Sequence, residues 1–297
     1  MLDAEVVTVD TGLGVTFQLA LGKDDRDGVS QIVRSGACPV PESLQFLLSG
    51  VPRGVTVLDL GANIGTFAVA AAAFGYDVIA VEASDRNVEL LRESVRLNGF
   101  MNIRVVSVAV FDRVGTVFFH QNGPYGMVNT SSSAPPGFFE VPTTTVDAIL
   151  ELLQPTKKVG FVKIDIKGSE TAAVRGMARL LGGQDAPPVF YEANGFTLDF
   201  FDKTPAALVS EFRRHGYESY RAESKRLAPL DDGYIQYPCV VDYLATKGGL
   251  RGGGCSTRSA VTAWRNRSTT PFARRPCRRG STAHTWRGLC RWRSRAS

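Results

Sequence analysis

One stretch of the sequence decides the fold, Val57-Leu-Asp-Leu-Gly-Ala-Asn-Ile-Gly-Thr66. Residues 55–60 form a short apolar run without a polar face, which is typical of a central parallel strand covered on both sides. Gly61 and Gly65 end this run, and residues 65–74 are alanine-rich with strong helix propensity. The order of strand, tight glycine turn and helix predicts half of a βαβ unit.

The next apolar run, residues 77–82, ends on Glu82, which lies 23 residues after Asp59. In α/β nucleotide folds an acid at this place accepts hydrogen bonds from the ribose hydroxyls. The turn reads G-A-N-I-G rather than G-x-G-x-x-G, and Asp59, two residues before Gly61, would repel a pyrophosphate at the helix N-terminus. A nucleoside that carries an ammonium and a sulfonium but no phosphate fits better, and we interpret the turn as a site for S-adenosylmethionine. For either acid alone, an ordinary strand-end carboxylate remains an open alternative.

Length and composition indicate a globular protein. With 297 residues, 44% of them hydrophobic, the chain is expected to form one domain of about 250 residues plus an appendage. The apolar stretch 67–74 is far shorter than the roughly 20 residues that span a bilayer, and no basic-then-apolar leader opens the chain. We expect a soluble, cytoplasmic protein. The first 247 residues contain two of the five cysteines, Cys38 and Cys239, without a spacing motif; they predict neither a disulfide framework nor a zinc site, and no metal ligand set is expected.

The composition changes sharply at Gly248. Residues 248–297 contain 12 arginines, all three tryptophans and no acid, so that the preceding residues carry a formal charge of −7 although the whole chain carries +5. This tail has no hydrophobic period and few branched apolar residues, which predicts disorder. We interpret it as a segment without an evolved role, such as an extension read out of frame; the alternative is an arm for nucleic acid or anionic lipid. Because the body is acidic, no nucleic-acid partner is expected.

Strands and helices alternate along the chain after residue 50. Residues 1–50 are predicted to form an N-terminal extension of two strands and a short helix, residues 51–247 the cofactor-binding domain, and residues 248–297 the tail. Predicted helices cover residues 84–98, 169–181 and 205–215, and predicted strands cover 103–110, 159–166, 189–192 and 234–245. This order indicates an α/β, Rossmann-like fold with an open, mostly parallel sheet and helices on both faces. Residues 121–139, after a hairpin strand over 116–120, are predicted to be a long loop that covers the substrate.

Candidate catalytic groups come from the strand ends. Asp59, Glu82 and Asp165 each close a predicted strand and should meet at one edge of the sheet, while Glu170 opens the following helix, whose dipole favours its ionised form. Methyl transfer from a sulfonium needs an aligned nucleophile and a base, and a carboxylate is sufficient for a hydroxyl acceptor. Asp165 and Glu170 are therefore the candidate bases. It stays open whether Asp165 is instead a cofactor or structural ligand and Glu170 only a helix N-terminal acid.

Between residues 30 and 245 the chain resembles the FkbM-type methyltransferases, S-adenosylmethionine-dependent enzymes that mostly methylate hydroxyl groups on natural products and sugars. The resemblance rests on six short segments spread over this range: Val57–Gly65, Val81–Ala83, Leu97–Gly99, Ala109 with Asp112 and Gly115, Val141–Asp147, and Lys163–Glu170. It implies the class I methyltransferase fold. It also implies the contacts of the cofactor. The methionine part would be held by Asp59, Gly61, Asn63 and Gly65. The ribose would be held by Glu82, and the adenine by the stretch near Ala109.

One position departs from the pattern of that family. Its Lys-Ile-Asp-Val-Glu-Gly segment has a glutamate where this chain has Lys167, so a positive charge replaces a negative one near the presumed acceptor. Lys167 could pair with Asp165 and change which residue serves as base, or it could contact an acidic acceptor. We predict an O-methyltransferase whose small-molecule or glycolipid acceptor offers a hydroxyl of a sugar, glycolipid or polyketide-type natural product. The alternatives are a noncatalytic cofactor-binding protein of the same fold and, less favoured, a nucleic-acid methyltransferase.

Overall fold

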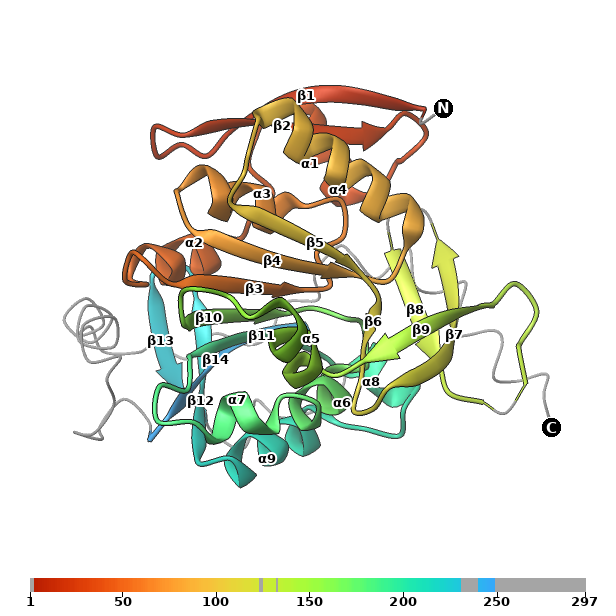
Figure 1. Ribbon diagram of the computed structural model, residues 1–297, viewed down its shortest axis with the longest axis vertical. Coiled ribbons are helices and arrows are strands. Elements are labelled where there is room, and N and C mark those ends of the chain that lie inside the picture. The colour runs from red at the N-terminus through yellow and green to blue at the C-terminus, as the bar shows by residue number, and fades with distance from the viewer. Residues whose placement is uncertain (1–2, 123–124, 132, 231–239, 249–297) are drawn as a thin grey trace.

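A large mixed sheet forms the centre of the molecule in the computed structural model, which describes residues 3–122, 125–131, 133–230 and 240–248 (Figure 1). Its strands, in chain order, are β3 (Thr56–Leu60), β4 (Asp77–Glu82), β5 (Ile103–Ser107), β10 (Val159–Ile164), β11 (Val189–Asn194), β12 (Tyr217–Glu223), β13 (Arg226–Pro229) and β14 (Val240–Lys247). Their spatial order is β13-β12-β14-β11-β10-β3-β4-β5. Neighbouring strands from β11 to β5 pair in parallel, whereas β14 is antiparallel to both of its neighbours and β13 is antiparallel to β12. The predicted open, mostly parallel sheet is confirmed.

The chain order reverses beside β3. From β3 the chain builds outward through β4 and β5, and it then returns to the other side of β3 to add β10 and β11. In open α/β sheets this reversal leaves a crevice at the carboxyl ends of the two central strands, which is where such folds bind ligands. All five residues of β3 are buried, as expected of a central strand.

Helices cover both faces of the sheet (Figure 1). One face carries α3 (Thr66–Ala73) and α4 (Asp85–Asn98), and the other carries α5 (Val146–Leu153), α6 (Glu170–Arg175), α7 (Ala178–Gly182) and α9 (Pro205–Arg214). The prediction of a helix over 84–98 is confirmed: the Ser84 hydroxyl accepts a hydrogen bond from the Asn87 amide at the start of α4, and Gly99 ends it in the left-handed conformation. The short helix α8 (Gly195–Asp199) follows β11 directly, and the Asn194 side chain caps its start by accepting hydrogen bonds from the amides of Phe196 and Thr197.

The single helix predicted over residues 169–181 is wrong. The segment forms α6 and α7 with a break at Gly176, where an added Cβ atom would lie 2.2 Å from the carbonyl oxygen of Phe111. The close approach of a distant backbone therefore sets the break. Local helix propensity carries no information about that contact.

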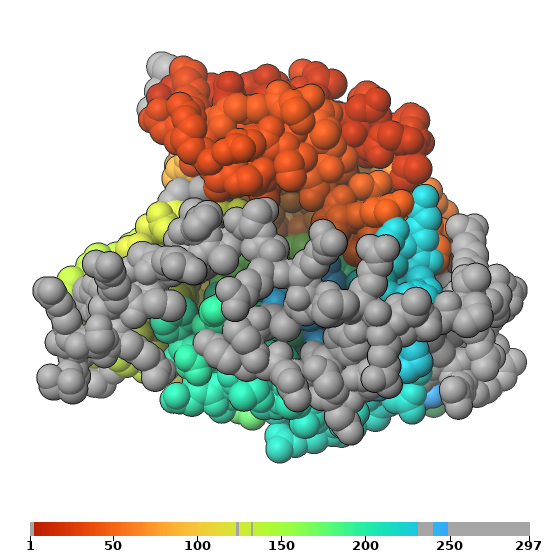
Figure 2. Space-filling model, turned by 180° about the vertical axis from the view of Figure 1, so that it is seen from behind, coloured from red at the N-terminus to blue at the C-terminus, as the bar shows by residue number. Residues whose placement is uncertain are grey.

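The N-terminal segment packs into the same core. Its elements are β1 (Ala4–Asp10), β2 (Thr16–Gly22), α1 (Gly28–Arg34) and α2 (Glu42–Ser49), and β1 and β2 form an antiparallel hairpin. The Ala20 amide donates to the Ser94 hydroxyl at 2.9 Å, and the Gln18 amide donates to the Asn98 side chain at 2.8 Å, which attaches β2 to α4. One hydrophobic cluster includes buried side chains from β2, α2, α3 and β4. Seen from behind, the N-terminal residues form a continuous part of the molecular surface (Figure 2).

A second, four-stranded sheet stands beyond the carboxyl ends of β3, β4 and β5 (Figure 1). It contains β6 (Ala109–Val110), β7 (Gly115–Asn122), β8 (Tyr125–Asn129) and β9 (Phe139–Thr144), in the order β6-β9-β7-β8. The prediction of a loop over 121–139 is therefore wrong at residues 125–129, which form β8 and pair with β7. Only Val128 of β8 is buried, so the strand lacks the alternation of buried apolar and exposed polar side chains by which a strand is recognised in a sequence. Gly126 is needed there, since a Cβ atom would meet the Phe119 ring at 1.9 Å.

Two further predictions concern membrane-spanning helices and the C-terminal tail. Within the described ranges, none of the helices is both long and apolar enough to cross a bilayer. The predicted disorder of the tail falls on residues 249–297, which lie outside the described residues, as does Cys239.

Candidate functional site

The glycine turn after β3 is pressed between two neighbouring segments. The amides of Gly61 and Ala62 both donate to the carbonyl oxygen of Val81, at 2.9 and 3.0 Å. Gly61 has φ +79°, and an added Cβ atom would lie 2.1 Å from the backbone oxygen of Asp165. Gly65 has φ +95°, and its Cβ atom would lie 2.3 Å from the Leu91 side chain. Both predicted glycines are thus demanded by positive φ and by close packing, and together they bring the turn, β4 and the segment after β10 to one edge.

Glu82 lies beside this turn and is only 8% exposed. One carboxylate oxygen accepts a hydrogen bond from the Asn63 amide at 2.8 Å, and the other accepts one from the Ser84 amide at 2.9 Å. Burial raises the pKa of Glu82, although these two amide hydrogen bonds oppose that effect. Because an ionised carboxylate offers about four acceptor positions, each oxygen keeps one for a ligand hydroxyl.

Asp59 lies behind the turn and is fully buried. Its carboxylate forms an ion pair with the Lys163 ammonium at 2.8 Å, and the same ammonium lies 3.5 Å from the carbonyl oxygen of Gly61. Burial raises the pKa of Asp59, and Lys163 acts in the opposite direction. The Lys163 ammonium therefore lies beside Asp59, where the sequence predicts the ammonium of a ligand. The signal for Lys163 is present in the sequence, as the one charged residue of the apolar run that forms β10.

Asp165 follows β10 and meets a second lysine. Its amide donates to the carbonyl oxygen of Leu60 at 3.0 Å, which places it beside the end of β3. The Lys167 ammonium lies 2.7 Å from a carboxylate oxygen of Asp165 and 3.0 Å from one of Glu192, the latter in β11. Burial alone would raise the pKa of Asp165, but the ammonium groups of Lys167 and Lys163 outweigh it and hold this pKa below its ordinary value. The structure thus brings Asp59, Glu82 and Asp165 to one edge, as the sequence predicts; Lys163 pairs with Asp59, and Lys167 joins Asp165 to Glu192.

Glu170 turns toward the backbone of the segment that precedes it. The side chain is buried, and its carboxylate accepts hydrogen bonds from the Ile166 amide at 3.2 Å and from the Gly168 amide at 2.9 Å. Burial raises the pKa of Glu170 to about 7. The Glu170 side chain is 1% exposed, and both of its carboxylate oxygens accept hydrogen bonds from amides of the loop that carries Asp165. Glu170 therefore packs against the buried side of this loop.

This raised pKa predicts a pH-dependent stability. The folded-state pKa of about 7 exceeds the ordinary 4.5, so the stability gained from a protonated Glu170 is complete below pH 4.5 and is lost as the pH rises through 7. The size of the loss is on the order of 3 kcal/mol. Since Glu170→Gln does not ionise, urea unfolding at pH 5 and pH 8 should show the variant gaining on the wild type by about 2 to 3 kcal/mol at the higher pH.

The matched control is Glu151→Gln, whose side chain is 70% exposed. It should show no such relative gain between the two pH values. Equal pH dependence for Glu170→Gln and the wild type would contradict the burial effect at Glu170.

Ala109 and the smaller sheet complete the surroundings of Glu82. Ala109 is buried in β6, and the Val108 amide just before it donates to the carbonyl oxygen of Glu82 at 2.9 Å. The predicted adenine-side stretch is therefore next to the predicted ribose ligand. In β8, the Tyr125 hydroxyl lies 3.4 Å from a carboxylate oxygen of Asp27, and burial raises the pKa of Tyr125 to about 12. Sequence reading did not single out Tyr125 or Asp27, because only tertiary packing brings β8 against the start of α1.

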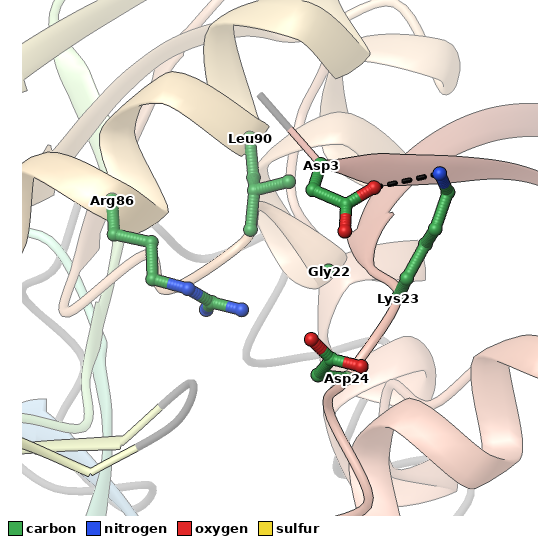
Figure 3. A pocket seen from close by; sticks show the side chains of 6 residues that line it. All are labelled: Asp3, Gly22, Lys23, Asp24, Arg86 and Leu90. Atoms are coloured by element: carbon green, nitrogen blue, oxygen red, sulfur yellow. Dashed lines mark ion pairs between the residues drawn. The ribbon is translucent and has the colours of Figure 1, made fainter. Parts of the chain in front are cut away.

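Other polar clusters fit a ligand less well. Among the residues that the structure describes, no group of three or more His, Cys, Asp or Glu is arranged to hold a metal ion. A pocket between the N-terminal hairpin and α4 is lined by Asp3, Gly22, Lys23, Asp24, Arg86 and Leu90 (Figure 3). Asp3 and Lys23 pair across it at 2.6 Å, and Arg86 pairs with Asp25 at 2.7 Å. Its lysine and arginine are therefore already matched by carboxylates of the protein.

The sequence of the chain matches a known protein family. The sequence model of the FkbM methyltransferase domain matches residues 59–219, which contain the turn, Glu82, Asp165 and Glu192. No curated protein matches the chain.

The chain is similar in fold to many solved structures, including three proteins from different organisms. They are the precorrin-6y C5,15-methyltransferase of Geobacter metallireducens GS-15 (16% identity, 77% of this chain and 93% of that chain covered, TM-score 0.40), TYW2 of M. jannaschii in complex with AdoMet (11%, 82% and 85%, TM-score 0.39), and the T. thermophilus 16S rRNA N2 G1207 methyltransferase in complex with AdoMet and guanosine (14%, 82% and 50%, TM-score 0.41). At these TM-scores nothing about ligand or substrate is inferred from them.

Proposed function

The chain belongs to the FkbM methyltransferase family, and we propose that it is an S-adenosylmethionine-dependent O-methyltransferase acting on a hydroxyl of a sugar, glycolipid or polyketide-type natural product. The observation that carries the proposal is Glu82, held at the end of β4 by two amides with one acceptor position left on each carboxylate oxygen. Two remaining acceptor positions on one carboxylate suit the two hydroxyls of a ribose.

The residues at this edge fit S-adenosylmethionine better than a dinucleotide. The turn before α3 reads G-A-N-I-G, without the G-x-G-x-x-G spacing with which a dinucleotide fold binds a pyrophosphate at the start of its helix. We propose that the methionine part lies along the turn at Gly61, Asn63 and Gly65, that Glu82 binds the ribose, and that the adenine lies toward Ala109. Since Asp59 is buried and paired with Lys163, its proposed contribution is to support the turn from behind. When bound, the cofactor supplies an electrophilic methyl group on a sulfonium.

Asp165 is the proposed base. With the cofactor bound, the Asp165 carboxylate would take the proton of the acceptor hydroxyl while the hydroxyl oxygen takes the methyl group from the sulfonium, whose sulfur would keep the electron pair of the broken bond. Asp165 lies at the carboxyl end of β10, next to the glycine turn, and its side chain is 31% exposed. Glu170, with 1% exposure and backbone amides on both oxygens, is proposed to position the segment that carries Asp165.

The proposal is tested by calorimetric titration of the full chain with S-adenosylmethionine, S-adenosylhomocysteine and NAD. We expect both sulfur nucleosides to bind and NAD to show no binding, because the turn lacks the G-x-G-x-x-G spacing that lets a backbone approach a pyrophosphate. A chain ending at residue 247 is expected to bind with the same affinity. Binding of NAD alone, or of none of the three, would overturn the proposal.

A noncatalytic cofactor-binding protein is the second candidate. The observation in its favour is Lys167, which pairs with the proposed base. Release of S-adenosylhomocysteine in a screen of hydroxyl acceptors separates the two functions, since only the enzyme produces it.

A further inference from the structure

Lys167 sits between two carboxylates at the edge of the sheet. Its ammonium lies 2.7 Å from Asp165 and 3.0 Å from Glu192, so it joins the segment after β10 to the strand β11 beside it. The Lys167 side chain is 18% exposed and that of Glu192 is 20% exposed. Ion pairs at this degree of burial are screened much less by solvent than the exposed pairs elsewhere on the molecule.

The backbone that carries Lys167 is fixed by three contacts. The Asp165 amide is bonded to β3, and the Gly168 amide is bonded to the buried Glu170. On the third side, a Cβ atom on Gly168 would lie 2.5 Å from the carbonyl oxygen of Thr197 in α8. Lys167 itself has φ +50°, a left-handed conformation that is strained for a lysine and persists only where the surroundings impose it.

The charges around Lys167 are predominantly negative. Asp242 of β14 pairs in register with Glu192, and burial together with the carboxylates of Glu192 and Asp165 raises the pKa of Asp242 to about 7. The charged and titratable groups that act on this cluster come from seven segments and are Asp59, Tyr125, Lys163, Asp165, Lys167, Glu170, Glu192 and Asp242. With two carboxylates already on its ammonium, Lys167 has no unbalanced charge with which to attract an acidic acceptor.

We propose that Lys167 is a positioning residue, whose ammonium holds the carboxylates of Asp165 and Glu192 together and keeps Asp165 charged and oriented to take the acceptor proton. This inference rests on the proposed function for the role of Asp165 as base. It decides between the two roles that the sequence left open for Lys167, in favour of pairing within the protein.

Removal of the cation has a direct electrostatic consequence. Without Lys167, the carboxylates of Asp165 and Glu192 would lie at the ends of adjacent strands, and Lys163 would be the remaining lysine that acts on Asp165 among the described residues. Like charges in one buried site disfavour joint ionisation, so one of the two carboxylates would hold a proton at higher pH. Loss of a cation at ion-pair distance raises the pKa of its partner by about one to three units.

The test is a carboxyl-carbon NMR titration of the full chain labelled with 13C at aspartate and glutamate carboxyls. The Asp165 signal is assigned by its absence in Asp165→Asn. In Lys167→Met the Asp165 titration midpoint should rise by about one to three pH units, whereas Lys167→Arg should stay near the wild type because it keeps the charge. Lys158→Met removes a lysine from an exposed pair with Asp185 and should leave the midpoint unchanged.

An unchanged Asp165 midpoint in folded Lys167→Met would overturn the inference. If that variant fails to fold, Lys167→Met combined with Glu192→Gln removes the cation and one carboxylate together, and the Asp165 midpoint should still lie above that of the wild type; a midpoint at the wild-type value would overturn the inference. The titration needs no cofactor, so it is independent of the calorimetry. Wild-type protein that does not bind S-adenosylmethionine would overturn the proposed function and leave the measured effect of Lys167 on Asp165 as it stands.

Discussion

Replacing Glu82 with alanine should weaken the binding of S-adenosylmethionine roughly 100-fold or more. The variant loses both acceptor positions proposed for the ribose hydroxyls, and hydrogen bonds to a charged group contribute about 1.5 to 3 kcal/mol each. It also leaves the amides of Asn63 and Ser84 without their acceptor, which loosens the turn that lines the same site. Calorimetric titration of wild type and variant with S-adenosylmethionine measures the loss directly, since each 1.4 kcal/mol is a factor of ten in affinity.

Two further variants show whether the loss belongs to Glu82 itself. Glu82→Gln keeps one carbonyl oxygen and should lose less affinity than the alanine variant. Glu93→Ala removes a carboxylate from the neighbouring helix α4, where Glu93 pairs with Arg96, and should bind like the wild type. An unchanged dissociation constant in a folded Glu82→Ala protein would show that Glu82 does not hold the ribose.

Gly61→Ala should have the largest effect on stability. Its φ of +79° costs an alanine about 1 to 3 kcal/mol, and its Cβ atom would lie 2.1 Å from the backbone oxygen of Asp165, which cannot rotate away as a side chain would. We expect a loss of about 4 kcal/mol or more, which corresponds to a fall in Tm of about 10 °C for a domain of this size. Thermal unfolding followed by circular dichroism measures it.

Gly75→Ala is the matched control. Gly75 has nearly the same backbone angle, φ +85°, but an added Cβ atom meets no heavy atom within 4 Å. Only the conformational cost of about 1 to 3 kcal/mol remains, so Tm should fall by about 3 to 8 °C, less than in Gly61→Ala. Equal falls for the two variants would mean that backbone strain, and not the contact with Asp165, is what requires glycine at position 61.

The central half of the fold was predictable because its signals are local. The apolar run of β3, the glycine turn and the capped helix α4 each follow from neighbouring residues, and all three are confirmed in the structure. The strand β8 was missed because it is held by backbone pairing with β7 and by the Phe119 ring over Gly126, neither of which leaves a period in the sequence. The break between α6 and α7 was missed because it is set by the backbone of Phe111, more than 60 residues away.

The same distinction applies to the site. Asp59, Glu82 and Asp165 could be placed at one edge from sequence, because the carboxyl ends of parallel strands always meet there. What each carboxylate does at that edge depends on its partners. Lys163 pairs with Asp59 across a gap of 104 residues, Lys167 joins Asp165 to Glu192, and Glu170 is turned inward by the amides of its own loop.

By itself, the sequence determined the type of sheet, the position of the turn and the acids that end its strands, because hydrophobic periodicity and glycine placement act over a few residues. Tertiary contacts decide that the Glu82 carboxylate is held by two backbone amides, whereas Asp59 and Asp165 are each paired with a lysine of the protein. The physical reason is that charge pairing, burial and close backbone contact are set by atoms that are far apart along the chain and near only in the folded molecule.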